Sequence, residues 1–578
     1  MDKKATNKLN KEYENKDFFG ESDESTSYTF VPVEAFHEVE EAGDRNSLEV
    51  NLLIHAENSH VMSALKRDYG GKIDLIYLDP PFDIGSDISI DLSFGEHSSK
   101  SAPKSNLFRA IAYGDHWKEG SESYLEMLQT RLLLCKELLS ERGSLYLHCD
   151  YRSTAYMRLI LEEIFGKKNY INECIWHYKT GGMPEKLGYG RKHDTIHFVV
   201  KDPNKAIWHP QKEKSYLGHK YGFKNIEIEK DERGHYTWTN LRDVWIIPAL
   251  RGNQPEKVDY PTQKPEALLE RIILASSDKD SIVADFFCGS GTTGVVAERL
   301  GRRWIMCDQG DLAIHTCRKR LLELHSEVKN KNATARHFLI LEAQEDETSG
   351  NLSKLYTDYK ESYIEKVFEV IGASREETGL FQGRLKGNPC YLVDLEKNAT
   401  KELVLKLEQS LSEMGEETGW CISFNFDEKL TQEFTRNQAI RLIQVPKEFF
   451  QQGRKSAPVF YEIPLCKFEV LHQLDDSYDV HIIDYVPAAT INGNNRNDNL
   501  KQNPSDFIDM WAIDFDYIPG KHFHYDWCDF RSRGKRSLEL SSSAHWKYSQ
   551  AGIFTIAAKI VDVSGVETVS LQQIKING

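Results

Sequence analysis

Apolar and polar residues along the first 330 positions predict short strands and longer helices in alternation. Apolar runs at 48–53 and 72–78 predict strands on either side of a helix at 59–69. Residues 124–139 place apolar side chains at i, i+3 and i+4, which is typical of an amphipathic helix, and 144–148 predicts another strand. Because strands that alternate with helices usually form a sheet covered by helices on both faces, we expect an α/β fold.

Two of the predicted strands end in turns with polar residues. The strand at 72–78 is followed by Asp79-Pro80-Pro81-Phe82, and a strand at 281–287 leads into Gly289-Ser290-Gly291-Thr292-Thr293. Glycines allow the backbone to approach a ligand, and a helix that begins near Thr292 directs its first amide groups toward that ligand. An Asp-Pro-Pro turn can also simply end a strand, since proline cannot extend a central strand. The presence of both turns favours a site for a nucleotide cofactor.

The two turns resemble motifs of the DNA amino-methyltransferases that use S-adenosylmethionine (SAM). In that family an Asp-Pro-Pro-aromatic tetrapeptide holds the target amine and a Phe-x-Gly-x-Gly turn holds the cofactor, and their order here is that of the beta group. Further segments that resemble family blocks are 143–150, 172–182, 243–245 and 260–265, so the resemblance covers residues 48–325. It implies a Rossmann-like fold with a doubly wound mixed sheet, SAM as the cofactor and double-stranded DNA as the substrate.

The first turn suits chemistry on the exocyclic amine of a base. This amine is a poor nucleophile because its lone pair is delocalised into the ring. Asp79 and a backbone carbonyl, held by Pro80 and Pro81, would accept both amino hydrogens and direct the lone pair at the SAM methyl group. Phe82 would stack on the base after it flips out of the duplex. His148, which ends a predicted strand, is expected to pack in the same cleft without a catalytic role.

The second turn and the strand after it are expected to bind SAM. Asp285 is a candidate for the SAM amino group, and Gly289 and Gly291 for backbone contact with its methionine part. Asp308 ends the next predicted strand, where a doubly wound fold places an acceptor for the ribose hydroxyls, and Asp311 is its nearest rival. The residues expected at the cofactor are Glu57, Asn58, Lys264, Asp285, Phe287, Gly289, Ser290, Gly291, Thr292, Thr293 and Asp308.

Several of these assignments leave alternatives open. Thr292 and Thr293 could serve only as caps of the helix that follows. Lys264, in a block that resembles Thr-Gln-Lys-Pro, would close over the methionine carboxylate, or would instead bind phosphate or solvent. Glu57 stands where the family usually has Asp, and Asp285-Phe286-Phe287 replaces the frequent Asp-Pro-Phe.

Charge is distributed unevenly along the chain. The whole sequence has a net charge of -16, but residues 167–264 hold 18 Lys and Arg against 12 Asp and Glu, together with 13 aromatic residues. Interleaved cations and aromatic faces suit phosphates and unstacked bases. We therefore expect a DNA-recognition segment here, with Trp176, Tyr178 and Lys179 at the target base. A solvated, aromatic-rich subdomain would have the same composition.

The remaining parts of the chain carry weaker signals. Residues 1–47 are acidic and Ser-rich and predict a mobile arm or a peripheral wrap without chemistry, and 82–113 predicts either a flap or a surface loop. Residues 330–347 read as a linker. The predicted domains are the arm at 1–47, the catalytic domain at 48–166 and 243–330, the recognition segment at 167–242, an α+β domain at 350–470 and a small β-sandwich-like domain at 475–578.

Composition narrows the class of protein. The ten cysteines never form a C-x-x-C pair, no charged-then-apolar leader opens the chain, and no stretch approaches 18 uninterrupted apolar residues. We therefore expect no structural metal, no disulfide framework and no contact with membranes, and a reducing cytoplasm as the location.

Methylation of adenine at N6 is the function that we expect. The first turn begins with Asp, whereas the cytosine enzymes of the family more often have Ser. Methylation of cytosine N4, methylation of structured RNA, and SAM-dependent binding of nucleic acid without catalysis are the alternatives. Frequent dimers in the family suggest a homodimer. No nuclease or helicase motif is visible, so a restriction or defence partner would be a separate chain.

Overall fold

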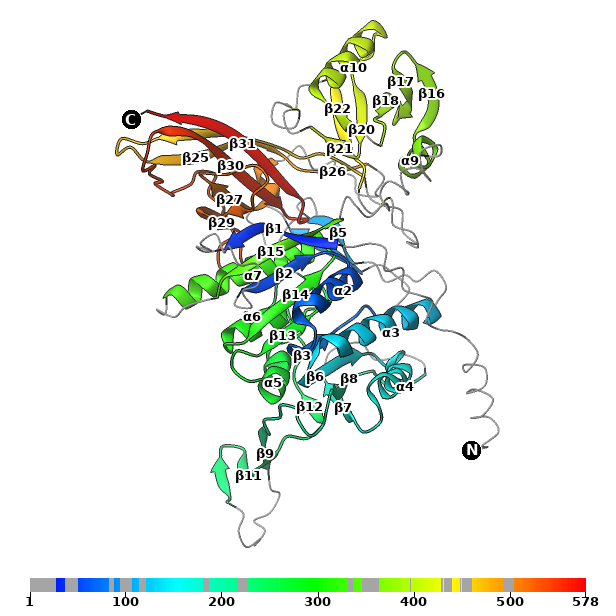
Figure 1. The fold of residues 1–578 in the computed structure, drawn as a ribbon, viewed down its shortest axis with the longest axis vertical. Coiled ribbons are helices and arrows are strands. Elements are labelled where there is room, and N and C mark those ends of the chain that lie inside the picture. The colour runs from blue at the N-terminus through cyan, green and yellow to red at the C-terminus, as the bar shows by residue number, and fades with distance from the viewer. Residues whose placement is uncertain are drawn as a thin grey trace.

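The computed structural model describes residues 28–36, 50–82, 88–93, 107–113, 121–179, 187–216, 227–252, 254–258, 260–330, 336–345, 363–395, 397–427, 430, 439–446, 449, 460–491 and 504–577. Their largest element is an eleven-stranded mixed sheet with the order β12-β7-β8-β6-β3-β13-β14-β2-β15-β1-β28 (Figure 1). Its presence confirms the predicted α/β fold.

The centre of this sheet is parallel. Strand β13 (Ile282–Asp285) lies between β3 (Ile73–Leu78) and β14 (Arg303–Asp308), and β2 (Asn51–His55) and β6 (Leu139–Cys149) extend it on either side in the same direction. The carboxyl ends of these strands therefore meet at one edge, which is where open α/β sheets bind ligands.

Helices cover both faces of the sheet because successive strand residues point to opposite sides. Leu53, Leu75 and Val283 pack with one set of helices, and Ile54 and Ile76 pack with the other. The first set is α5 (Glu266–Ser276), α6 (Thr292–Arg299) and α7 (Asp311–Asn330), and the second is α2 (Asn58–Tyr69), α3 (Ser121–Leu138) and α4 (Thr154–Phe165).

Two outer strands of the main sheet come from segments in which the sequence predicted no strand. Within the predicted arm, β1 (Tyr28–Phe36) joins the main sheet by pairing antiparallel with β15 (Phe338–Glu345), which lies in the predicted linker and runs parallel to β2. Ala35, Phe36 and Phe338 are fully buried, so apolar packing overrides the acidic and polar composition around these short strands. The rest of 1–49 lies outside the described residues.

The predicted recognition segment is only partly separate from the catalytic sheet. Strands β7 (Tyr170–His177) and β8 (His193–Val200) pair antiparallel with each other, and β8 pairs with β6, so both extend the main sheet. A three-stranded sheet of β9 (Lys212–Tyr216), β10 (Glu229–Asp231) and β11 (Gly234–Asn240) projects from the end of the molecule opposite the C-terminal sheets (Figure 1). The strand β12 (Val244–Ile246) returns the chain to β7.

The stretch expected to be a flap or loop contains an antiparallel pair, β4 (Ile88–Ser93) and β5 (Leu107–Tyr113). Residues 83–87, 94–106 and 114–120 lie outside the described part of the chain.

The described residues of the C-terminal half form two larger sheets and two two-stranded ones. A seven-stranded sheet packs with α9 (Tyr363–Ile371) and α10 (Lys401–Glu413); its strands are β16 (Ser374–Thr378), β17 (Phe381–Leu385), β18 (Asn388–Leu392), β20 (Gly419–Ser423), β22 (Ile440–Gln444), β23 (Tyr461–Glu462) and β26 (Ala489–Thr490). The hairpin of β24 (Leu465–His472) and β25 (Tyr478–Val486) shares a core with a four-stranded sheet of β29 (Trp527–Phe530), β27 (Ile508–Asp514), β30 (Gly552–Asp562) and β31 (Glu567–Ile576). We call this four-stranded sheet the C-terminal sheet. It contacts the main sheet through β28 (Phe523–His524), which pairs with β1.

Candidate active site

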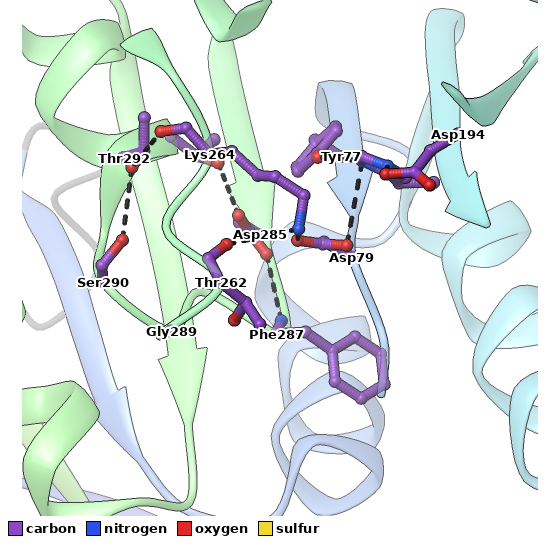
Figure 2. A network of polar contacts seen from close by, with 12 residues as sticks. Tyr77, Asp79, Asp194, Thr262, Lys264, Asp285, Phe287, Gly289, Ser290 and Thr292 are labelled. Carbon is purple, nitrogen blue, oxygen red and sulfur yellow. Dashed lines mark hydrogen bonds and ion pairs between the residues drawn. The ribbon is translucent and has the colours of Figure 1, made fainter. Parts of the chain in front are cut away.

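The two polar turns of the sequence meet because their strands are neighbours. In the register between β3 and β13, Leu75 pairs with Val283 and Tyr77 pairs with Asp285. Asp79 therefore follows β3 directly beside the point where β13 enters the glycine turn. Figure 2 shows Asp79, Lys264 and Asp285 gathered at this edge of the sheet.

Only one of the two carboxylate oxygens of Asp79 has a hydrogen-bond partner among the described residues. Its Oδ2 accepts a hydrogen bond from Lys264 Nζ in an ion pair, and its side chain is 16% exposed. Its Oδ1 is buried without a hydrogen-bond partner among the described residues, and His148 Nδ1 is 3.8 Å away. Since a buried acceptor without a partner costs free energy, Oδ1 is suited to a donor supplied by a ligand.

His148 belongs to a buried polar chain that the sequence did not reveal. Its Nδ1 lies 2.9 Å from the Tyr77 hydroxyl, and its Nε2 lies 3.3 Å from Asp194 Oδ2. Tyr178 donates a hydrogen bond of 3.0 Å to Asp194 Oδ1. Burial would raise the pKa of Asp194, but the hydrogen bond and charge of His148 hold it below its usual value. In the sequence Asp194 is one of four polar residues among the first five of β8 (His193–Val200), so its role is not apparent there.

Aromatic rings form one side of the site. The ring of Phe82 lies 5.7 Å from that of His148, which lies 5.6 Å from Trp176, and Trp176 lies 4.9 Å from Tyr178. Trp176 is buried and its Nε1 donates to Ile247 O at 2.8 Å, so its position is fixed by the core. Lys179 is exposed at the rim of this group. The structure thus brings together the residues expected at the target base.

The glycine turn leads into α6 with a conformation that requires glycine. Gly291 has φ of 73°, and a Cβ atom there would lie 2.7 Å from Cys317 Sγ. Gly289 has φ of 48°, and its N–H donates to Asp308 Oδ2 at 2.9 Å. Asp308 also accepts from Gly310 N at 3.0 Å. The acid at the end of β14 therefore shapes the turn, in addition to its expected role at the ribose.

Thr292 and Thr293 do not cap the helix through their side chains. Gly291 is the N-cap residue of α6, and no side-chain cap is present. Thr293 Oγ1 donates to Asp285 Oδ2, and Thr292 Oγ1 donates to Lys264 O at 3.3 Å. The alternative that both threonines are caps is therefore wrong: they tie the first helical turn to Asp285 and to the Lys264 segment.

Asp285 is a buried acid with no cationic neighbour of its own. Its Oδ1 accepts from Phe287 N at 3.0 Å. Burial raises its pKa to about 7, against a usual 3.8, even though its hydrogen bonds act in the opposite direction. Burial also raises the pKa of Asp308. Two neighbouring buried acids whose pKa is raised by burial favour a ligand that carries positive charge and hydrogen-bond donors.

Glu57 and Asn58 lie beside the turn and are tied to Arg131. Glu57 caps α2 by accepting from Ser59 N at 2.7 Å, and it forms an ion pair with Arg131. Burial would raise its pKa, but the charge of Arg131 lowers it below the usual value. Asn58 donates to Phe286 O at 3.0 Å and accepts from Arg131 Nε at 3.0 Å. Both side chains thus border the cofactor turn while also supporting it.

Three further observations on the described residues concern metal ions, disulfides and membranes. Within them, no group of three or more His, Cys, Asp or Glu side chains is arranged to hold a metal ion. All ten cysteines are free. Among the described helices, none is long and apolar enough to cross a membrane.

An acid with one free oxygen, beside a glycine turn on a doubly wound sheet, defines an enzyme that transfers a group from a nucleotide cofactor. Comparisons with known proteins identify the family. Residues 73–318 match the family model described as DNA methylase. DNA adenine methyltransferase YhdJ of Escherichia coli (strain K12) is 30% identical over 260 residues, which are 44% of this chain and 78% of that protein. Type II methyltransferase M.HpaI of Haemophilus parainfluenzae is 30% identical over 271 residues, which are 46% of this chain and 72% of that protein.

The chain belongs to the DNA methylase family and is a DNA methyltransferase that uses SAM. Among solved structures, the M1.HpyAVI-SAM complex is 23% identical and covers 47% of this chain and 98% of its own, with a TM-score of 0.30. The family assignment rests on the sequence relatives.

Proposed function

We propose that the protein transfers a methyl group from SAM to N6 of adenine in double-stranded DNA. The observation that carries this proposal is Asp79 Oδ1, a buried acceptor without a partner that lies between aromatic rings and the glycine turn. YhdJ, whose printed name gives adenine as its target, supports adenine over cytosine. The Asp that opens the tetrapeptide supports the same choice.

Asp79 and the two prolines orient the target amine. The free Oδ1 accepts one N–H of adenine, and a carbonyl held by Pro80 and Pro81 accepts the other. These two hydrogen bonds draw the lone pair out of the ring and direct it at the cofactor. Lys264 pairs with Oδ2, so it orients the carboxylate without competing for the amine. After transfer, the nitrogen gives one proton to Asp79 Oδ1.

The base is held outside the duplex by the ring of Phe82, with Trp176 and Tyr178 behind it. Because Trp176 is hydrogen-bonded to Ile247 and buried, it gives this wall a fixed position before DNA binds. Such pre-organisation lowers the cost of binding an unstacked base.

Residues at the carboxyl edge of the sheet hold the cofactor. SAM supplies an electrophilic methyl group. Asp285 accepts its ammonium group, the backbone at Gly289 and Gly291 approaches its methionine part, and Asp308 accepts from the ribose. Phe287 and Ser290 complete the turn, and Glu57 and Asn58 border it. Lys264 was expected at the methionine carboxylate, but its ion pair with Asp79 supports a role at the target amine instead.

DNA recognition is assigned to the projecting sheet of β9, β10 and β11. Tyr216 and Trp238 are exposed there, and Lys214 Nζ lies 5.9 Å from the ring centroid of Trp238. Cations beside exposed rings suit phosphates and bases. We further propose that the protein forms a homodimer and that any restriction or defence partner is a separate chain. We also propose a reducing compartment, and the ten free cysteines support this location.

Long-read sequencing that detects modified bases tests the proposal in cells that express the chain, its Asp79→Ala variant or its Asp74→Ala variant. Asp74 lies on the same strand but accepts only from Ser140, so it serves as the matched control. We expect methylated adenine at one short motif with the wild type and Asp74→Ala, and none with Asp79→Ala, which still binds SAM. Methylated cytosine would overturn the choice of base, and unchanged methylation by Asp79→Ala would overturn the mechanism.

A further inference from the structure

Helix α7 lies between the glycine turn and the C-terminal sheet. Its side chains divide between the two by helical spacing, since residues three apart share a face. Cys317 and Arg320 contact the turn, whereas His315, Arg318 and Lys319 contact the C-terminal sheet or β1. A displacement of this helix would therefore alter its contacts with both the glycine turn and the C-terminal sheet.

On the side of the turn, Arg320 connects α7 to the glycine turn and to α5 by hydrogen bonds. Its Nη1 donates to Ser290 O at 2.8 Å and to Thr292 Oγ1 at 3.0 Å, and its Nη2 donates to Glu266 Oε1 at 2.9 Å. Cys317 Sγ donates to Gly289 O at 3.3 Å and fills the space that a side chain at position 291 would need. Both side chains are buried, so the turn rests directly on α7.

On the other side, α7 is held by a buried ionic cluster. Arg318 donates from Nε and Nη2 to both oxygens of Glu34 on β1, at 2.9 and 2.6 Å, and to Glu567 of β31 at 2.5 Å. Lys559 of β30 pairs with the same two carboxylates. Tyr525 donates to Glu34 at 2.7 Å. Arg318 and Glu34 are each 1% exposed, so removing one partner would leave an uncompensated charge.

Two further contacts fix the first half of the helix. Asp509 of β27 lies 2.7 Å from His315 Nε2 and accepts from Lys319 Nζ at 2.6 Å. Gly565, in the turn between β30 and β31, has φ of 91°, and a Cβ there would lie 2.8 Å from Asp311 C. The C-terminal sheet thus touches α7 with its backbone as well as with charged side chains.

We propose that the C-terminal sheet is part of the cofactor site: it sets the position of α7, and Arg320 transmits that position to the turn that binds SAM. Arg320 is a positioning residue in this arrangement. The family match ends at residue 318, before Arg320 and the whole C-terminal sheet. The inference rests on the proposed role of residues 289–293 as the SAM turn.

The Asp509→Asn variant tests the coupling, because it removes the charge that pairs with α7 and keeps the shape of the side chain. We expect KM and Kd for SAM to rise about tenfold, a coupling of ordinary size, while kcat at saturating SAM and the affinity for DNA stay within about twofold. Asp529→Asn is the matched control, since Asp529 lies on β29 of the same sheet and pairs with Lys535 rather than with α7. It should lower thermal stability without changing the affinity for SAM.

Amide hydrogen exchange on the unmodified chain gives a second measurement that does not depend on the folding of a variant. Because coupling is reciprocal, SAM should slow exchange in α7 and in β27, β30 and β31. Protection confined to the glycine turn, or equal loss of SAM affinity in both variants, would overturn the inference. Failure of the unmodified chain to bind SAM by calorimetry would instead refute the proposed role of the turn.

Discussion

Asp285 should make the affinity for SAM depend on pH below neutrality. Burial raises its pKa to about 7 in the protein without ligand. Its proposed partner, the SAM ammonium, favours the ionised carboxylate, so the bound state has a lower pKa than the free state. Binding must then release a proton whenever the pH is below the pKa of the free protein, and the affinity weakens as the pH falls.

The size of this effect follows from the fraction of Asp285 that is ionised. With a pKa of about 7, about half of the carboxyls are ionised at pH 7 and about one in eleven at pH 6, so Kd should rise about fivefold over that unit. The dependence approaches about tenfold per unit below pH 6. Above pH 8 the affinity should fall again, because an α-amino group has a pKa near 8 and SAM loses its own charge.

Isothermal titration calorimetry at pH 5.5 to 8, in two buffers with different ionisation enthalpies, measures both the affinity and the released proton. We expect release of about half a proton at pH 7. The Asp285→Asn variant should bind SAM weakly at every pH and lose the slope below pH 7. An affinity of the wild-type protein that is flat between pH 5.5 and 7, or the same slope in the variant, would refute this reasoning.

Two other predictions address Lys264 and His197. Replacement of Lys264 by Met leaves Asp79 without its cation, so kcat should fall about 100-fold while KM for SAM changes little; a rise in KM for SAM with kcat intact would show that the lysine serves the cofactor instead. Burial lowers the pKa of His197 to about 4. As the pH falls from about 6.5 to 4, His197 therefore becomes protonated in the unfolded chain but stays neutral in the folded chain. Stability should drop by roughly 3 kcal/mol over this window in urea titrations, and His197→Gln should flatten the drop; parallel curves for the two proteins would contradict the assignment.

The meeting of the two polar turns could be predicted because it depends on local patterns. Both polar turns follow apolar strands, and parallel strands bring their carboxyl ends to one edge of the sheet. Once β3 and β13 are neighbours, Asp79 and Asp285 must lie close together. The sequence also predicted that the glycines allow a close approach of the backbone. In the structure, Cys317 leaves no room for a side chain at position 291.

The partners of Asp79 could not be predicted in the same way. Asp194 reaches His148 because β8 pairs antiparallel with β6, and the sequence of 193–200 does not reveal which strand it will join. The composition of the surrounding basic segment instead suggested a separate recognition domain. The polar chain of Tyr77, His148, Asp194 and Tyr178 therefore emerges only from the pairing of strands.

The role inferred for the C-terminal sheet could not be predicted from the sequence either, because it too depends on contacts between distant residues. In a sequence, charged residues such as Glu34, Arg318 and Lys559 normally indicate a solvated surface, because burial of an unpaired charge is costly. These three residues are buried only because they lie together, although Arg318 and Lys559 stand 284 and 525 positions from Glu34. No local pattern links residues so distant. Because β1, α7 and β30 each bring a charge whose burial without the others would be costly, the cluster forms only when all three have come together. In the arrangement proposed above, the support of the cofactor turn by α7 therefore depends on β1 as well as on the C-terminal sheet.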